Sequence, residues 1–184
     1  MNIAITAIQD KPAVILTPVE DAHLIRNAYE AIACVGKRPI ATGWTTGEIT
    51  VDRLANERAL YPNAVSTGLR TGALVGIDID VVKWEHATKL RSVVQGILGV
   101  TPLRRKGAKG LMLLYRNETP ISKIVIGSER PDEAKVEILG TGQQLVAFGI
   151  HPGTGKRYEW ADGGKATPLA VPFNALPLVT PDKV

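Results

Sequence analysis

The sequence of 184 residues is poor in cysteine and in long apolar runs, and each shortage excludes a class of protein. Its one cysteine, Cys34, cannot form a disulfide within the chain or a zinc site built from several cysteines. Because it lies in the apolar run AIACV, we expect a buried, unreactive thiol. No stretch reaches the ~18 consecutive apolar residues of a membrane span, and the N-terminus lacks the basic-then-apolar order of a secretory signal. We therefore expect a cytoplasmic protein without structural zinc.

The composition is that of an ordinary folded domain. Hydrophobic residues make up 45% of the chain and charged residues 22%, so a core can form. A chain of this length makes about one domain. We predict a single domain over residues 1–165. The chain after Trp160 is rich in glycine, proline and alanine, so residues 166–184 are expected to be a C-terminal tail or a linker.

Periodicity and turn residues predict a mixture of helices and strands. Helices are expected over 19–35, 51–60 and 84–98, the first capped by Thr17 with Pro18 at its start. Strand-like runs fill 63–81, where a turn at 68–72 suggests a hairpin. Further strands follow in LMLLYR, in KIVI and in KVEILGTGQQLVAFG, the last with a turn at 140–142. The fold class is therefore α+β, with a mainly antiparallel central sheet.

Two aspartates in the segment ALVGIDIDV are the most informative residues in the chain. Side chains alternate between the faces of a strand, so Asp78 and Asp80 point to one side and Ile77 and Ile79 to the other. Two carboxylates side by side repel each other unless a cation or hydrogen bonds offset their charge. Mg²⁺ takes such oxygen ligands together with substrate phosphates. The alternative is a solvated strand face.

A third acid, Glu137, stands between Val136 and Ile138 in the segment KVEILG, on the polar face of its own strand. If that strand neighbours the aspartate strand, three carboxylates converge. Three acids can hold two metal ions ~3.5–4 Å apart, the arrangement that serves phosphoryl transfer. The alternative for Glu137 is an ordinary exposed glutamate.

Positive charge gathers between the two acidic segments. The net charge is +4, and the stretch LRRKGAKGLMLLYR contains Arg104, Arg105 and Lys109 without an acid. These cations could bind the phosphates of a nucleotide held by the metals. A solvated basic loop would have the same sequence, so both interpretations stay open.

Three segments in order resemble the N-terminal primase/polymerase domain of bifunctional replication proteins from phages and plasmids, a branch of the archaeo-eukaryotic primase superfamily. They are GKRPIATGW, NAVSTGLRTGALVGIDID and KVEILGTGQQLVAFGIHPGTGKRYEW, within residues 24–160. The resemblance implies a catalytic core with a sheet like that of RNA-recognition motifs, joined to an N-terminal αβ unit, so that two αβ subunits surround one cleft. It also implies two-metal nucleotidyl transfer, with DNA template or primer and nucleoside triphosphates as partners, and often a helicase domain.

The resemblance assigns roles to individual residues. Its acid-x-acid motif falls on Asp78 and Asp80, and its hydrophobic-acid motif on Val136 and Glu137. The three acids would be both the catalytic residues and the ligands of Mg²⁺ or Mn²⁺. The family's serine-x-histidine motif is absent, and the segment AKGL offers Lys109 near its place. A lysine neutralises phosphate as a point charge but does not reproduce the hydrogen bonds of an imidazole.

His151 completes the candidate nucleotide-binding residues, with Lys109, Arg104 and Arg105. It opens the turn HPGTG, where glycines permit close approach of a ligand, and a plain turn histidine is the alternative. The favoured function is template-directed DNA primase/polymerase activity. Two rivals stay open: a two-metal nuclease or phosphodiesterase, and a replication-initiation module that binds DNA without chemistry.

Overall fold

The computed structural model describes residues 16–128 and 134–184. Its helices are α1 (Pro18–Arg26), α2 (Val51–Leu60) and α3 (Trp84–Leu98), with short 3-10 turns at Asp162–Gly164, Phe173–Ala175 and Pro181–Lys183. Its strands are β1 (Ala31–Val35), β2 (Arg38–Pro39), β3 (Ser66–Arg70), β4 (Leu74–Asp80), β5 (Arg104–Lys106), β6 (Leu111–Arg116), β7 (Ile124–Gly127), β8 (Lys135–Leu139), β9 (Gln144–Phe148) and β10 (Glu159–Trp160).

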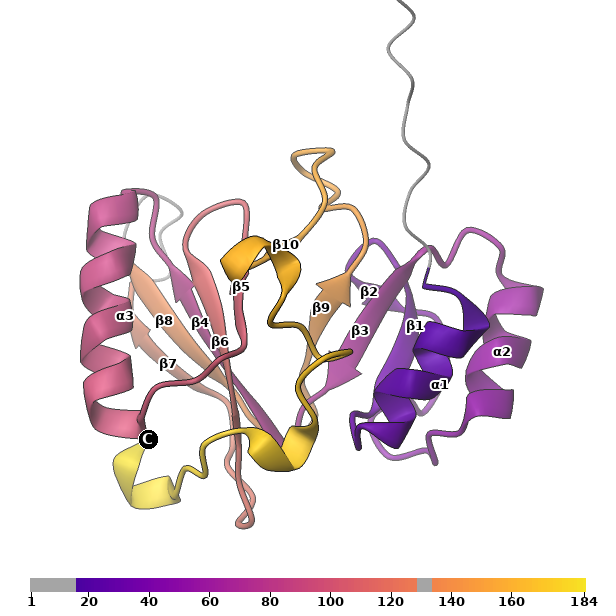
Figure 1. Cartoon of the computed structure of the whole chain (residues 1–184), viewed down its shortest axis with the longest axis horizontal. Helices are drawn as coiled ribbons and strands as arrows, with labels where there is room; N and C mark the ends of the chain where they lie inside the picture. Colours follow the sequence, from indigo (N-terminus) through magenta and orange to yellow (C-terminus); the bar gives the residue numbers. More distant parts are fainter. Residues whose placement is uncertain (1–15, 129–133) are drawn as a thin grey trace, which may run out of the picture.

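The strands form two antiparallel sheets. A four-stranded sheet has the order β2-β1-β3-β9, and a six-stranded sheet has the order β10-β5-β6-β4-β8-β7. Helices α1 and α2 pack against the smaller sheet and α3 against the larger one, so the helices lie on the outer sides of the molecule (Figure 1). The predicted α+β class with mainly antiparallel sheets is confirmed.

Helix α1 ends much earlier than the sequence predicted. A capping box between Thr17 and Glu20 starts it, with Pro18 in the first turn. The chain leaves the helix after Arg26, and Ala28 takes a positive φ of 64°. The run AIACV is then strand β1, with its first four residues buried. The prediction of one helix over 19–35 was wrong because a short apolar run fits a buried strand as well as a helix.

The expected hairpin over 63–81 was also wrong, because consecutive strands enter different sheets. β3 pairs with β1 and β9, while β4 pairs with β6 and β8. The chain crosses between the sheets at 71–73 and again at the predicted turn 140–142, between β8 and β9. These two crossings are joined, since the Thr71 amide donates to the Gln143 carbonyl and its hydroxyl to the Gly140 carbonyl.

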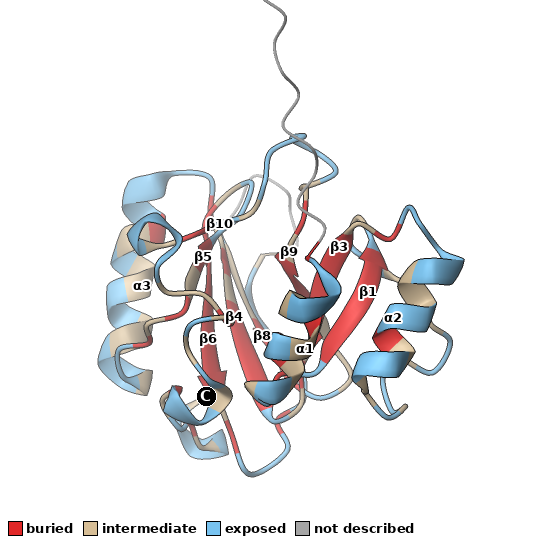
Figure 2. Ribbon diagram, turned by 45° about the vertical axis from the view of Figure 1, so that its right-hand side comes forward, coloured by how far each residue is buried: buried red, intermediate tan, exposed pale blue. Residues whose placement is uncertain are grey.

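Two buried clusters stabilise this arrangement (Figure 2). One lies between the larger sheet and α3 and includes Ile77, Ile79 and Leu113, each at most 2% exposed. Burying such a side chain contributes roughly 1.5–3 kcal/mol. The other cluster joins the smaller sheet and its helices to the opposite face of the larger sheet. The predicted helices at 51–60 and 84–98 are confirmed, the latter ending at Gly99.

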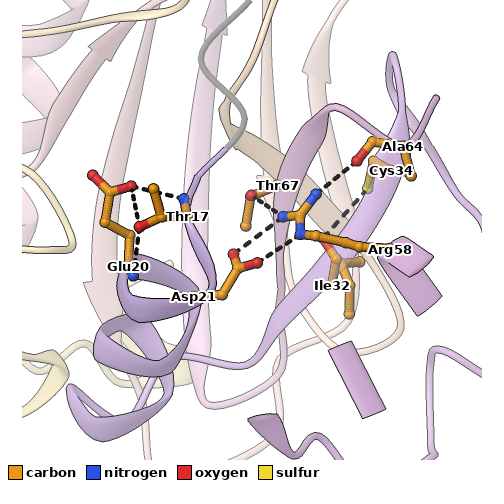
Figure 3. Close-up of polar contacts among 8 residues, drawn as sticks. All are labelled: Thr17, Glu20, Asp21, Ile32, Cys34, Arg58, Ala64 and Thr67. Carbon is orange, nitrogen blue, oxygen red and sulfur yellow. Dashed lines mark hydrogen bonds and ion pairs between the residues drawn. The ribbon is translucent and has the colours of Figure 1, made fainter. Parts of the chain in front are cut away.

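A buried ion pair fixes α1 to α2. The Arg58 guanidinium lies 2.6 Å from one Asp21 carboxylate oxygen, and Asp21 is 3% exposed. Arg58 also donates to the Ala64 carbonyl and the Thr67 hydroxyl (Figure 3). Burial raises the pKa of Asp21, although Arg58 acts in the opposite direction. The network therefore orients both helices on the smaller sheet.

Residues 166–184, expected as a tail or linker, pack along the body of the protein. Leu176 and Val179 are 2% and 1% exposed, and each belongs to one of the two buried clusters. The Asn27 amide donates to the Pro168 and Leu169 carbonyls. This segment thus contributes to both cores. Across the part of the chain that the structure describes, no helix is long and apolar enough to cross a membrane.

Candidate active site

Strand β4 lies in the middle of the larger sheet and presents acidic and apolar residues on opposite faces. Ile77 and Ile79 enter the cluster under α3, as the alternation predicts. Asp78 and Asp80 leave the other face and line an open cavity of about 320 Å³. The cavity lies where the two sheets meet, since Gln144 and Val146 of β9 also line it. The acids are therefore accessible to a ligand from between the sheets.

The cavity brings positive charge to the two aspartates. Its basic lining residues come from distant parts of the chain: Lys37, Arg105, Lys109 and His151. Acids that can hold a cation thus share one space with bases that can hold an anion. This combination suits a ligand that carries both a metal and phosphate groups.

Asp78 is the most perturbed acid of the cavity. Burial raises its pKa to about 6, and the neighbouring charges of Asp80 and Glu137 act in the same direction. Arg105 and Lys37 oppose this rise. A buried carboxylate with a raised pKa gains from any added cation, because the cation offsets the lost hydration.

Arg105 is the most buried cation of the cavity. The residue is 6% exposed, and its guanidinium lies 4.2 Å from the centre of the Tyr158 ring. Burial lowers its pKa, while Tyr158 and Asp78 act to raise it. Its Nε makes no hydrogen bond to any residue the structure describes. The Tyr158 ring thus holds the Arg105 guanidinium at the wall of the cavity, where its positive charge can attract an anion.

Lys109 lies beside the aspartates on the loop between β5 and β6. Its Nζ is 3.3 Å from an Asp80 carboxylate oxygen. The next residue, Gly110, has a φ of +69°, and a Cβ there would collide with the Ile79 carbonyl oxygen. Glycine is therefore required where the loop passes over β4. This close passage brings Lys109 to Asp80.

Glu137 occupies the predicted strand but makes other contacts. β8 pairs with β4, and Glu137 is directly opposite Asp78, so the two strands are neighbours. The Glu137 carboxylate, however, lies 2.8 Å from Lys123 and 3.3 Å from Lys135, and it does not line the cavity. Partial burial opposes its ionisation, but hydrogen bonds and charge from the two lysines outweigh burial and lower its pKa.

The other two predicted residues, Arg104 and His151, lie in different places. Arg104 points to the opposite face from Arg105, where it pairs with Asp162 at 3.0 Å, outside the cavity. His151 lines the cavity, with its ring 5.5 Å from that of Tyr158 in an edge contact. Burial lowers its pKa, and the charges of Lys37 and Arg105 act in the same direction. A neutral imidazole can both donate and accept a hydrogen bond.

Lys37 and Tyr158 were not identified from the sequence. Lys37 lies in the tight turn between β1 and β2, and its carbonyl accepts a hydrogen bond from Gln144 at 2.8 Å. This turn belongs to the smaller sheet, so only the packing of the two sheets brings Lys37 near Asp78. Its segment, GKRP, belongs to the sequences that carry the family resemblance, but nothing in them assigns a role to Lys37. No spacing in the sequence points to Tyr158.

The donor set fits a hard divalent cation in part. Asp78 and Asp80 offer carboxylate oxygens next to cations that bind phosphate, and Mg²⁺ often binds through one or two carboxylates plus phosphate oxygens. Among residues 16–128 and 134–184, no three His, Cys, Asp or Glu side chains stand close enough to hold a metal by themselves. Glu137 would have to exchange its lysine contacts to become a third ligand.

The fold and the cavity define an α+β protein with an acidic and basic site between two sheets. Comparison with protein-family models gives the family: residues 13–177 match the bifunctional DNA primase/polymerase N-terminal domain. The chain belongs to this family, and the resemblance seen in the sequence is confirmed. A search of curated proteins found no match.

Proposed function

We propose that this chain is a template-directed DNA primase/polymerase that adds nucleotides to a nucleic-acid chain. Membership of the family supports primase/polymerase-type nucleotidyl transfer. The observation that carries the proposal is the cavity in which Asp78 and Asp80 face Arg105, Lys109 and Lys37. A nucleoside triphosphate is an anion that binds metal, and this lining matches both of its properties.

The reaction joins a 3′-hydroxyl oxygen to the α-phosphorus of a bound triphosphate and releases pyrophosphate. Asp78 and Asp80 would hold Mg²⁺ or Mn²⁺, with Glu137 as a third ligand after it leaves its lysines. Bound divalent metal supplies charge that lowers the pKa of the attacking hydroxyl and offsets charge on the leaving pyrophosphate.

The cations of the cavity would position the triphosphate. Arg105 is fixed on the Tyr158 ring and offers a planar pair of donors. Lys109 would exchange its contact with Asp80 for phosphate oxygens once metal binds the aspartates. His151, whose pKa burial lowers, would donate one hydrogen bond to the nucleotide. Arg104 lies on the other face and takes no part in this step.

The proposal is tested by incorporation of labelled nucleotides on a primed single-stranded template with Mg²⁺ or Mn²⁺. Asp78→Asn should reduce incorporation on the order of 10²-fold or more, since the charge that holds the metal is lost. Asp52→Asn is the matched control, because Asp52 is an exposed acid in the first turn of α2 and should leave activity unchanged.

Two results would overturn this function. Cutting of DNA without incorporation would instead support the two-metal nuclease. Binding of DNA without either reaction, unaffected by Asp78→Asn, would support a replication module without chemistry.

A further inference from the structure

Trp84 is an exposed aromatic side chain next to the active-site loop. It begins α3 and is 51% exposed, and neither core found among the described residues includes it. Leaving half an indole in water gives up apolar burial that a packing residue would gain. Its ring lies 5.7 Å from Lys106 Nζ, so a cation already approaches its face.

Two hollows meet at this ring. One, of about 230 Å³, lies between Trp84 and the loop from Lys106 to Gly110. The other, of about 280 Å³, continues from Trp84 along Arg91 and Arg104. The loop residues Gly107, Ala108 and Lys109 line both the first hollow and the acid cavity. A single loop therefore lies between the acid cavity and the surface that runs from Trp84 to Arg91.

Basic side chains lie beside the Trp84 ring on this surface. Lys106 pairs with Glu159 at 3.7 Å, and both side chains are more than half exposed, so water screens the pair and a phosphate can replace it. Arg104 pairs with Asp162 at 3.0 Å. The Nε atoms of Arg91 and Arg104 are buried, and neither makes a hydrogen bond to a described residue. Arg91 and Arg104 both line the second hollow, so their guanidinium groups add positive charge along it.

We propose that this surface, made by Trp84, Lys106, Arg91 and Arg104, binds single-stranded nucleic acid beside the active site. An unpaired base would stack on Trp84, while the flanking phosphates contact Lys106 and Arg91. Aromatic stacking combined with a basic groove binds single strands with little sequence preference, whereas bases in a duplex are already stacked. The proposal deepens the proposed function, because the strand would be the template or primer that reaches the acids across the 107–109 loop.

The test measures binding separately from chemistry. A fluorescent oligothymidylate roughly 12 nucleotides long, within the usual site sizes, is titrated in EDTA without nucleotides. Trp84→Ala should weaken binding roughly 5- to 150-fold, the range for loss of one stacked base. Trp44→Ala, at a partly buried tryptophan near the smaller sheet, is the matched control and should bind as the native chain does. Binding by Trp84→Ala with native affinity overturns the proposal.

Salt dependence tests the cations. Lys106→Ala should weaken binding and reduce the slope of log affinity against log salt by about 1, as for loss of one phosphate contact. An unchanged slope would remove Lys106 from the strand path.

Tryptophan fluorescence gives a measurement that does not need Trp84→Ala to fold. In the Trp44→Phe chain only Trp84 can meet a base, because Trp160 is 7% exposed and donates its indole N–H to the Ala147 carbonyl. Saturating oligothymidylate should therefore quench the emission of this chain. Unquenched emission at saturation overturns the stacking.

The test also separates this proposal from the proposed function. Asp78→Asn should lose incorporation and keep oligonucleotide binding. If Asp78→Asn is inactive while Trp84→Ala binds normally, the polymerase function stands and the Trp84 surface is refuted. If Asp78→Asn incorporates normally while Trp84→Ala loses binding, the proposed polymerase site is refuted and the Trp84 surface stands.

Discussion

Glu137 on β8 lies directly opposite Asp78 on β4, yet its carboxylate is held by Lys123 and Lys135 rather than shared with the aspartates. Both strands were identified from the sequence, and their pairing places the acids on one face of the sheet. The lysine contact places Lys123 in competition with a metal for the third carboxylate. That competition gives a test of Glu137 as a ligand.

Removing Lys123 should make the metal easier to bind. Lys123→Gln is expected to lower the Mg²⁺ concentration for half-maximal incorporation about threefold, the effect of losing one partly exposed ion pair. The measurement is a Mg²⁺ titration of nucleotide incorporation. Lys89→Gln, at an exposed lysine on α3, should leave the requirement unchanged. An unaltered requirement in Lys123→Gln would show that Lys123 does not compete with the metal for Glu137.

Asp78 should make the stability of the metal-free protein depend on pH. Its pKa rises from 3.8 to about 6 on folding, so the folded state binds its proton more tightly than the unfolded state. The free energy of unfolding should therefore fall as pH rises from about 4 to about 6, by up to about 3 kcal/mol. Urea unfolding in EDTA across this range measures the change.

Asp78→Asn supplies the comparison for this pH dependence. The neutral amide carries no charge to bury, so the fall in stability over this window should shrink and the variant should match or exceed the native chain near neutral pH. A fall of the same size in both proteins would assign the effect to another group.

Alanine substitutions at Gly110 and Gly142 distinguish the cost of a left-handed backbone from the cost of a steric clash. Both have positive φ, +69° and +76°, but only at Gly110 would a Cβ meet the Ile79 carbonyl, while at Gly142 no described heavy atom lies within 4 Å. Gly142→Ala should cost about 1–2 kcal/mol for the left-handed backbone. Gly110→Ala should cost at least about 3 kcal/mol and displace Lys109. Equal losses in urea unfolding would argue against the close passage of the loop.

The pair between Asp21 and Arg58 should be strongly coupled. Arg58→Met leaves a buried carboxylate without its partner and should cost about 3–5 kcal/mol of unfolding free energy. The double variant with Asp21→Asn should recover much of that loss, because no unpaired charge remains. Glu118→Gln, at an exposed pair with Arg116, should change stability by under about 0.5 kcal/mol. A double variant as unstable as Arg58→Met would contradict the coupling.

Local sequence predicted the elements for which the periodicity of apolar residues and the residues that end a helix indicate the same bounds. The helices at 51–60 and 84–98 have the predicted bounds, and the structure shows that Thr50 caps the first and that the second ends at Gly99. Prediction failed at 31–35 and at the 68–72 turn, because an apolar run and a glycine turn are compatible with several partners. Which sheet a strand joins depends on contacts with residues far along the chain.

The sequence alone determined that Asp78 and Asp80 share one face of their strand and that Ile77 and Ile79 share the other, because strand alternation is a local property of the backbone. Only the tertiary structure decided which cations meet those acids. Arg105 faces the cavity and Arg104 does not, and Lys37 arrives from the other sheet. These contacts depend on how the two sheets pack against each other, and the spacing of residues along one strand does not determine that packing.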